Sequence, residues 1–142
     1  MKAISITLLA GAMAAAVACS SSSTSPSASI AGTYVLSSVN GESLPAIVTK
    51  TGDDTAVVVA DTLALTANNT YTRHAVDTLR SEVSGVTLYS HVSSGTYARS
   101  GSSITLTDAV TDSSATGTIA NNAITISSVE NGFAVTGVFT KQ

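Results

Sequence analysis

The sequence predicts an all-β domain that follows an export signal and a short polar tether. Apolar and polar residues alternate with a period of two after Ile30, and turn-forming Asn and Gly recur at short intervals between the alternating runs. Only one short run, 77–83, places apolar residues at helical spacing. Alternation of this kind buries one face of each strand. At 142 residues the chain is expected to form a single folded domain.

The N-terminal residues 1–18 have the three parts of a secretory signal peptide. Met1 and Lys2 make a short positive start, and a largely apolar run continues to Ala18, where the residues become small. This run is shorter than the roughly 20 residues that cross a bilayer as a helix. We therefore expect the segment to direct export and to be removed between Ala18 and Cys19.

The cleavage region reads Ala16, Val17, Ala18, Cys19. A Cys directly after a small residue resembles the lipobox of bacterial lipoproteins, and the same residues also fit the A-x-A pattern of an ordinary secreted protein. Cys19 is the sole cysteine, so the exported chain cannot form an internal disulfide. Lipidation of Cys19 explains its position, and the resemblance then implies an envelope protein anchored to a membrane. In that family Ser20, rather than Asp, after the Cys implies the outer membrane, with the protein facing the periplasm.

Residues 19–29 are expected to be a tether, and 30–142 the folded domain. From 20 to 29 the chain reads SSSSTSPSAS, which offers no large apolar side chain for a core. Ser-rich segments behave as flexible coil. These residues would let the domain stand away from the membrane.

The domain divides into short alternating segments, which we interpret as strands. They are expected at 31–39, 45–50, 55–66, 70–79, 85–99, 103–110, 114–120, 123–129 and 132–140. Tight turns between successive strands predict an antiparallel up-and-down meander. A flat sheet would leave two edges and a bare face, so we predict closure into a small barrel of about eight strands, with a sandwich as the alternative.

A tripeptide recurs at Gly32-Thr33-Tyr34 and at Gly95-Thr96-Tyr97, where each copy opens or bends a strand. The stretches GTYVLSSVNGESLP, DTLALTANNTYT and GTYARSGSSITLTDA are similar to the strand-turn-strand phrases of bacterial lipocalin-like lipoproteins, which carry small calycin-type barrels. The resemblance covers most of the domain and lies in pattern and turn placement. It implies a non-enzymatic protein that binds a small or apolar ligand in its barrel.

Charge and composition argue against several other functions. The chain has 6 Lys plus Arg against 9 Asp plus Glu, a net charge of -3, and therefore lacks the basic clusters that nucleic acid requires. His74 and His91 have no spacing that brings two imidazoles to one metal. No Gly-x-Ser-x-Gly elbow is present. We therefore expect no enzymatic activity, no metal and no cofactor.

Some polar residues occupy positions where the alternation predicts an inward-pointing side chain. These residues mark a candidate ligand site. If Leu63 and Leu65 point inward, the alternation places Tyr71, Arg73 and Asp77 on the same face. An inward Arg73 needs a partner such as Asp77, an open barrel mouth or a bound anion, unless it lies at a strand end or a bulge reverses the parity. The candidate ligand-binding residues are Tyr34, Leu36, Tyr71, Arg73, Tyr97 and Arg99.

The small side chains of the domain leave two functions open. With few large rings to fill a barrel, either an internal cavity or a narrower barrel with a dry aliphatic core is compatible with the sequence, and composition does not separate the two. A cavity favours a ligand carrier. A packed interior favours an interaction module, such as a periplasmic protease inhibitor or an envelope assembly accessory, that contacts a protein through Asn40–Pro45 and Leu79–Gly85.

Overall fold

The computed structural model describes residues 29–130 and 133–142. The predicted signal peptide, the lipidation site Cys19, nearly all of the tether and the turn expected at 131–132 lie outside the described residues. The described residues form strands joined by turns. The strands are β1 (Gly32–Val39), β2 (Glu42–Ser43), β3 (Ala46–Thr51), β4 (Asp54–Leu65), β5 (Thr70–Ser81), β6 (Gly85–Ser100), β7 (Ser103–Asp108), β8 (Ser114–Ala120), β9 (Ala123–Glu130) and β10 (Phe133–Lys141).

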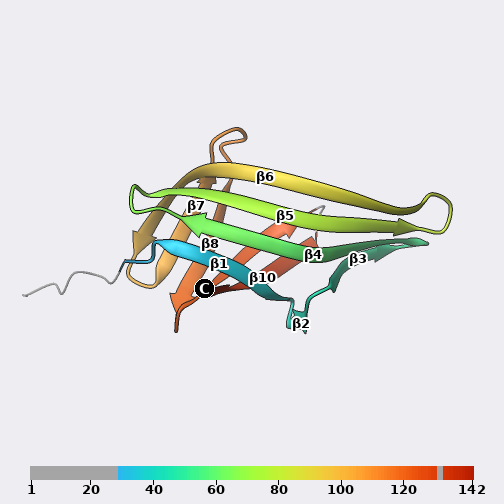
Figure 1. Cartoon of the computed structure of the whole chain (residues 1–142), viewed down its shortest axis with the longest axis horizontal. Coiled ribbons are helices and arrows are strands. Elements are labelled where there is room, and N and C mark those ends of the chain that lie inside the picture. The colour runs from blue at the N-terminus through green and yellow to red at the C-terminus, as the bar shows by residue number, and fades with distance from the viewer. Residues whose placement is uncertain (1–28, 131–132) are drawn as a thin grey trace, which may run out of the picture.

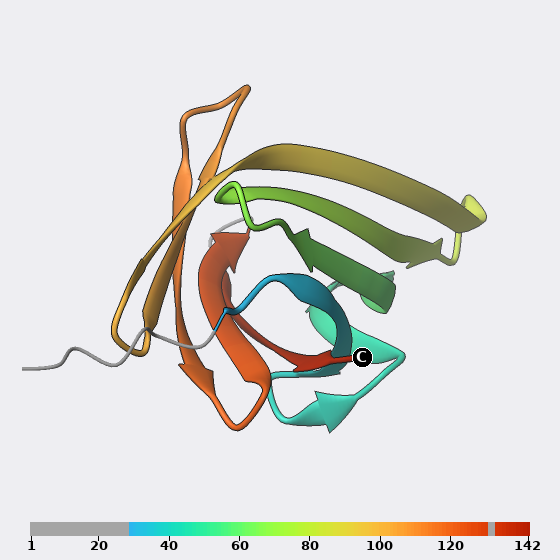
Figure 2. The ribbon, with the colours of Figure 1, turned by 60° about the vertical axis from the view of Figure 1, so that its left-hand side comes forward.

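The strands form one antiparallel sheet that closes on itself (Figures 1 and 2). Successive strands from β3 to β10 are neighbours, β10 pairs with β1, and β1 pairs with β4 from Gly32↔Leu65 to Val35↔Thr62. This last pairing makes a barrel of eight strands, β1 and β4–β10, with β2 and β3 attached at its side. The predicted all-β meander and its closure are confirmed, and the sandwich alternative is wrong.

Turn chemistry explains where the strands end. Asn40, Asn69, Asn121 and Asn122 all adopt positive φ, between 49° and 62°, in turns that join or follow strands. Asn tolerates this left-handed conformation because its short side chain is compatible with it. The expected strand limits therefore agree closely with the observed ones. The two-residue β2, in the loop after Asn40, has no signal in the alternation.

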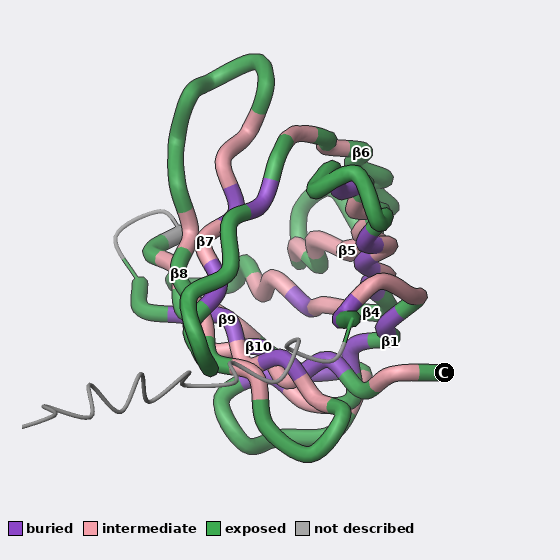
Figure 3. The backbone as a smooth tube through the Cα atoms, turned by 90° about the vertical axis from the view of Figure 1, so that its left-hand side faces the viewer, coloured by how far each residue is buried: buried purple, intermediate pink, exposed green. Residues whose placement is uncertain are grey.

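The barrel core consists of the inward-pointing residues of these strands. Leu63 and Ile124 are fully buried, and Ile104 and Tyr34 are nearly so. Figure 3 shows buried and exposed positions alternating along the wall, as the period-two pattern predicted. Burial of aliphatic and aromatic side chains in this interior supplies the main stabilisation of the fold.

The two Gly-Thr-Tyr copies close one end of the barrel. The Tyr34 hydroxyl donates to the Ile30 carbonyl at 2.8 Å, and the Tyr97 hydroxyl donates to the Thr66 carbonyl at 2.6 Å. Burial, and secondarily the nearby Tyr97, raises the pKa of Tyr34. Gly95 is required because a Cβ there would lie 1.9 Å from the Thr107 carbonyl oxygen. This end is therefore packed shut by rings whose hydroxyl groups are satisfied.

β-bulges in two of the barrel strands shape the other end. The register shifts in β1 between Leu36 and Ser38, and in β4 between Val58 and Ala60. The β4 bulge puts Val58 on the same face as Asp61, although the two are an odd number of positions apart. Beyond the bulge, β4, β5 and β6 run past the barrel wall as a long ribbon (Figure 1).

Candidate functional site

The barrel holds a cavity of about 340 Å³ away from its closed end. Its walls come from β1, β4, β5, β6, β9 and β10. The lining residues are Leu36, Val39, Val58, Asp61, Arg73, Ala75, Asp77, His91, Ser93, Ile126, Ser128, Val135, Gly137 and Phe139. This volume falls at the lower end of the range found for small-molecule sites. The side chains thus leave space unfilled at this end of the barrel, whereas the other end is packed.

The cavity has one polar wall and one apolar wall. Arg73, Asp77, His91 and Ser93 extend from β5 and β6, whereas β1, β9 and β10 contribute mainly aliphatic and aromatic side chains. The apolar wall consists of Leu36, Val39, Ile126, Val135 and Phe139. A small molecule with a polar group on one side fits this division, because each part meets groups of its own polarity.

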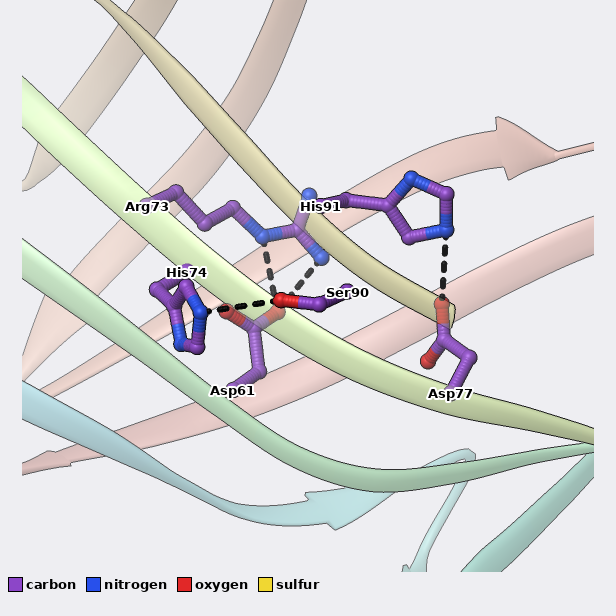
Figure 4. Close-up of polar contacts among 6 residues, drawn as sticks. All are labelled: Asp61, Arg73, His74, Asp77, Ser90 and His91. Atoms are coloured by element: carbon purple, nitrogen blue, oxygen red, sulfur yellow. Dashed lines mark hydrogen bonds and ion pairs between the residues drawn. The ribbon is translucent and has the colours of Figure 1, made fainter. Parts of the chain in front are cut away.

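The centre of the polar wall is an ion pair between Asp61 and Arg73 (Figure 4). Arg73 Nε and Nη2 donate to Asp61 Oδ2 at 2.7 Å and 2.6 Å. Asp61 is 1% exposed, while the Arg73 side chain is 36% exposed because it reaches into the cavity. A buried carboxylate needs such a partner, since desolvation of an uncompensated charge is costly. The ion pair therefore compensates the desolvation of Asp61 and stabilises charged groups inside a largely apolar barrel.

Phe139 joins the two walls. Its ring lies under the Arg73 guanidinium, with 6.0 Å from Cζ to the ring centroid. A cation over an aromatic face is attracted by the negative π surface. Arg73 is thereby held from β4 by a carboxylate and from β10 by a ring, which restricts its guanidinium to one part of the cavity.

A second polar pair lies further along the same wall. His91 Nε2 is 3.8 Å from Asp77 Oδ2, and the His91 ring stacks on that of Tyr89 with centroids 6.3 Å apart. His74 lies on the outer face, where its Nε2 is 3.0 Å from Ser90 Oγ. Figure 4 labels both histidines, and the pairing of His74 with Val92 and of Ala75 with His91 puts their side chains on opposite faces of the sheet. Because they occupy opposite faces of the sheet, they do not converge on one ligand.

The residues predicted for the ligand site are only partly brought together. Leu36 and Arg73 line the cavity. Tyr34 and Tyr71 are buried and do not line it, and the pKa of Tyr71 is raised, first by burial and then by Asp108. Tyr97 and Arg99 meet instead at a shallower hollow near Ile30. Arg99 is exposed there, and its Nε donates to the Gly101 carbonyl at 2.8 Å.

Sequence reasoning missed Asp61, the carboxylate that binds Arg73. The signal was present, because Asp61 precedes Leu63 by two positions and therefore shares its inward parity. Asp77, the partner suggested by the sequence, does face inward, and it lies beside His91. Val58 carried no such signal, since only the bulge in β4 turns it inward.

Two features are absent from residues 29–130 and 133–142. They contain no group of three or more His, Cys, Asp or Glu side chains placed to hold a metal ion. In the same residues no helix has the length and apolar character needed to span a bilayer.

The fold and the cavity define a class: a small closed antiparallel barrel with a partly open cavity of mixed polarity. The barrel agrees with the architecture that the lipocalin-like resemblance implies. No family model, curated protein or solved structure matches this chain.

Proposed function

We propose that this protein is a non-enzymatic, lipid-anchored cell-envelope protein whose barrel binds a small, largely apolar ligand. The single observation that carries the proposal is the cavity of about 340 Å³ with its apolar and polar walls. A barrel of eight strands has room for side chains or for one small ligand. Here the side chains leave that room in part unfilled.

The chemistry of the walls defines the ligand class. Leu36, Val135 and Phe139 offer a surface for an aliphatic or aromatic body. Arg73 and Ser93 on the facing wall offer hydrogen-bond donors to one polar group, such as a carboxyl, carbonyl or hydroxyl. The ligand is therefore expected to be amphipathic rather than a pure hydrocarbon.

Native mass spectrometry of the gently purified protein tests ligand binding directly. The wild type should carry a reproducible excess mass that denaturation removes. Ala75 lines the cavity, so Ala75→Phe should fill it and abolish the excess mass. Ala98 on β6 is exposed outside the cavity, so Ala98→Phe is the matched control and should retain the ligand.

A bare protein mass for the wild type would count against the ligand carrier. Retention of the excess mass by Ala75→Phe would place the ligand elsewhere. In either case the alternative, an interaction module that binds an envelope protein through Asn40–Pro45 and Leu79–Gly85, would take precedence. Recovery of a defined envelope partner with the purified chain would then identify its function.

The anchor and the location are tested separately. A radiolabelled palmitate supplied to cells should enter the wild type and be absent from Cys19→Ala, because thioether lipidation needs that thiol. The labelled protein should fractionate with the outer membrane, facing the periplasm. Equal labelling of both proteins, or of neither, would contradict the lipid anchor.

A further inference from the structure

One edge of β6 is left open over most of its length. β6 pairs with β5 from Gly85 to Thr96, but with β7 only from Gly95 onward. Among the described residues, no strand pairs with the other edge of β6 between Gly85 and Ser93. This edge forms the rim of the long ribbon in Figure 1. At about 3.4 Å per residue, it is about 30 Å long.

Two hydrogen bonds identify the backbone groups that face this edge. The Ser94 carbonyl accepts from Ala109 N, on the β7 side, whereas Tyr97 N donates to the Asn69 carbonyl, on the β5 side. Successive residues of a strand direct their N–H and C=O groups to opposite sides, and β5 and β6 pair without a register shift. The groups of Leu88, Ser90 and Val92 therefore point to the open edge.

The side chains along this edge do not protect it. Val86, Leu88 and Val92 share the outer face and are 66%, 65% and 70% exposed. From 85 to 94 the sequence contains no Lys, Arg, Asp, Glu or Pro, the residues that natural edge strands use against further pairing. The edge strand at the other side of this ribbon, β3, has features that discourage further pairing. It is shorter than β6, follows Pro45 and carries Lys50.

We propose that this edge binds a second copy of the chain, so that β6 pairs with β6 in an antiparallel, two-fold symmetric sheet. A two-fold axis at Ser90 places Leu88 opposite Val92 of the second copy, and Val92 opposite its Leu88. In this register the backbone groups of Leu88, Ser90 and Val92 lie opposite the same groups of the second copy. Each outward N–H can then donate to a C=O of the other chain. Such an isologous contact closes on itself and leaves no open end for growth.

Charge favours a second copy over a foreign strand. The segment from 85 to 94 carries no Lys, Arg, Asp or Glu, so two copies meet without repulsion, and nothing on the edge selects a partner of opposite charge. The exposed Leu88 and Val92 form cross-strand apolar pairs with each other, which stabilise antiparallel strands. Leu88, Ser90 and Val92 do not line the ligand cavity.

The test uses two full-length chains with different tags after Gln142, expressed in the same cell and extracted in mild detergent. The wild-type chains should purify together, and light scattering should give a protein mass twice that of one chain. Leu88→Lys with Val92→Lys should abolish both results, because like charges would face each other across the axis. Val129→Lys is the control, since Val129 on β9 is 72% exposed and should leave the pair intact.

A second variant separates loss of pairing from loss of fold. Ser90→Pro removes an N–H that faces the open edge, and a proline is tolerated at such a position. It should give a single-chain mass with an unchanged far-ultraviolet circular dichroism spectrum. A wild type that is a single chain at all concentrations, a lysine variant that still pairs, or a mass that requires a foreign chain would each overturn the proposal.

Discussion

Removal of Arg73 should destabilise the protein more than removal of its partner Asp61. In Arg73→Met the carboxylate of Asp61 stays inside the barrel without the two hydrogen bonds from the guanidinium. In Asp61→Asn the cation that remains is 36% exposed and can be hydrated from the cavity. The two variants remove the same ion pair. A difference in their loss of unfolding free energy therefore shows which member of the pair is the more deeply buried.

The structure sets the size of each effect. Breaking a buried pair and leaving its charge costs about 3–5 kcal/mol, which applies to Arg73→Met because Asp61 is 1% exposed. Asp61→Asn should cost about 1–2 kcal/mol, since it loses a charged hydrogen bond while Arg73 remains partly solvated. The double variant should be more stable than the sum of the single effects implies, because it leaves neither the carboxylate without this guanidinium nor the guanidinium without this carboxylate.

Urea unfolding at pH 7, followed by circular dichroism, measures these free energies. The four proteins form a double-mutant cycle, and their m-values must agree for the comparison to hold. A coupling of about 2 kcal/mol or more is expected. Equal losses for Asp61→Asn and Arg73→Met, or additive losses in the double variant, would refute the conclusion that Asp61 is the buried member of a coupled pair.

Three further predictions concern the closed end and a turn. Gly95→Ala should cost about 3 kcal/mol in thermal or urea unfolding, because its Cβ would overlap the Thr107 carbonyl, and an unchanged midpoint would contradict that contact. Tyr34→Phe should cost about 1 kcal/mol at pH 7. Because burial raises the pKa of Tyr34 above 10.0, the wild type should lose stability as the pH rises from about 10 through that raised value, and Tyr34→Phe should lose less. Backbone N–H groups of Thr111 and Val110 lower the pKa of Asp108 below 3.8. The protection factors of these two amides, taken against intrinsic exchange at each pH, should therefore hold above pH 3.8 and fall as the pH drops through the lowered value, with no such step in Asp108→Asn.

The period-two alternation predicts which residues face the cavity side of the sheet, but not how deep in the barrel they lie. Counting by two from Leu63 correctly places Arg73 and Asp77 on the inner face, and the same count would have found Asp61. The count does not predict depth along the barrel. Tyr71 and Arg73 share a face, yet Tyr71 is packed near the closed end and Arg73 lines the cavity.

The β-bulges and the contacts made by barrel closure could not be predicted from the sequence. The register shift between Val58 and Ala60 changes which residues of β4 point inward. No residue in that run of valines and alanines predicts the shift. Phe139 comes near Arg73 because β1 bridges β10 and β4 when the sheet closes. Contacts of this kind join residues far apart in the chain, so a local pattern does not contain them.

The sequence by itself determined the strands, their order, the turns between them and the inner face of most of them. These properties are local, since they follow from side-chain alternation and from the positive φ that Asn and Gly allow. Only the tertiary structure decided which inward residues pack and which leave a cavity, that Asp61 partners Arg73, and that β6 keeps an open edge. Those outcomes depend on how a closed sheet is staggered and on how the side-chain volumes from all its strands fill one interior.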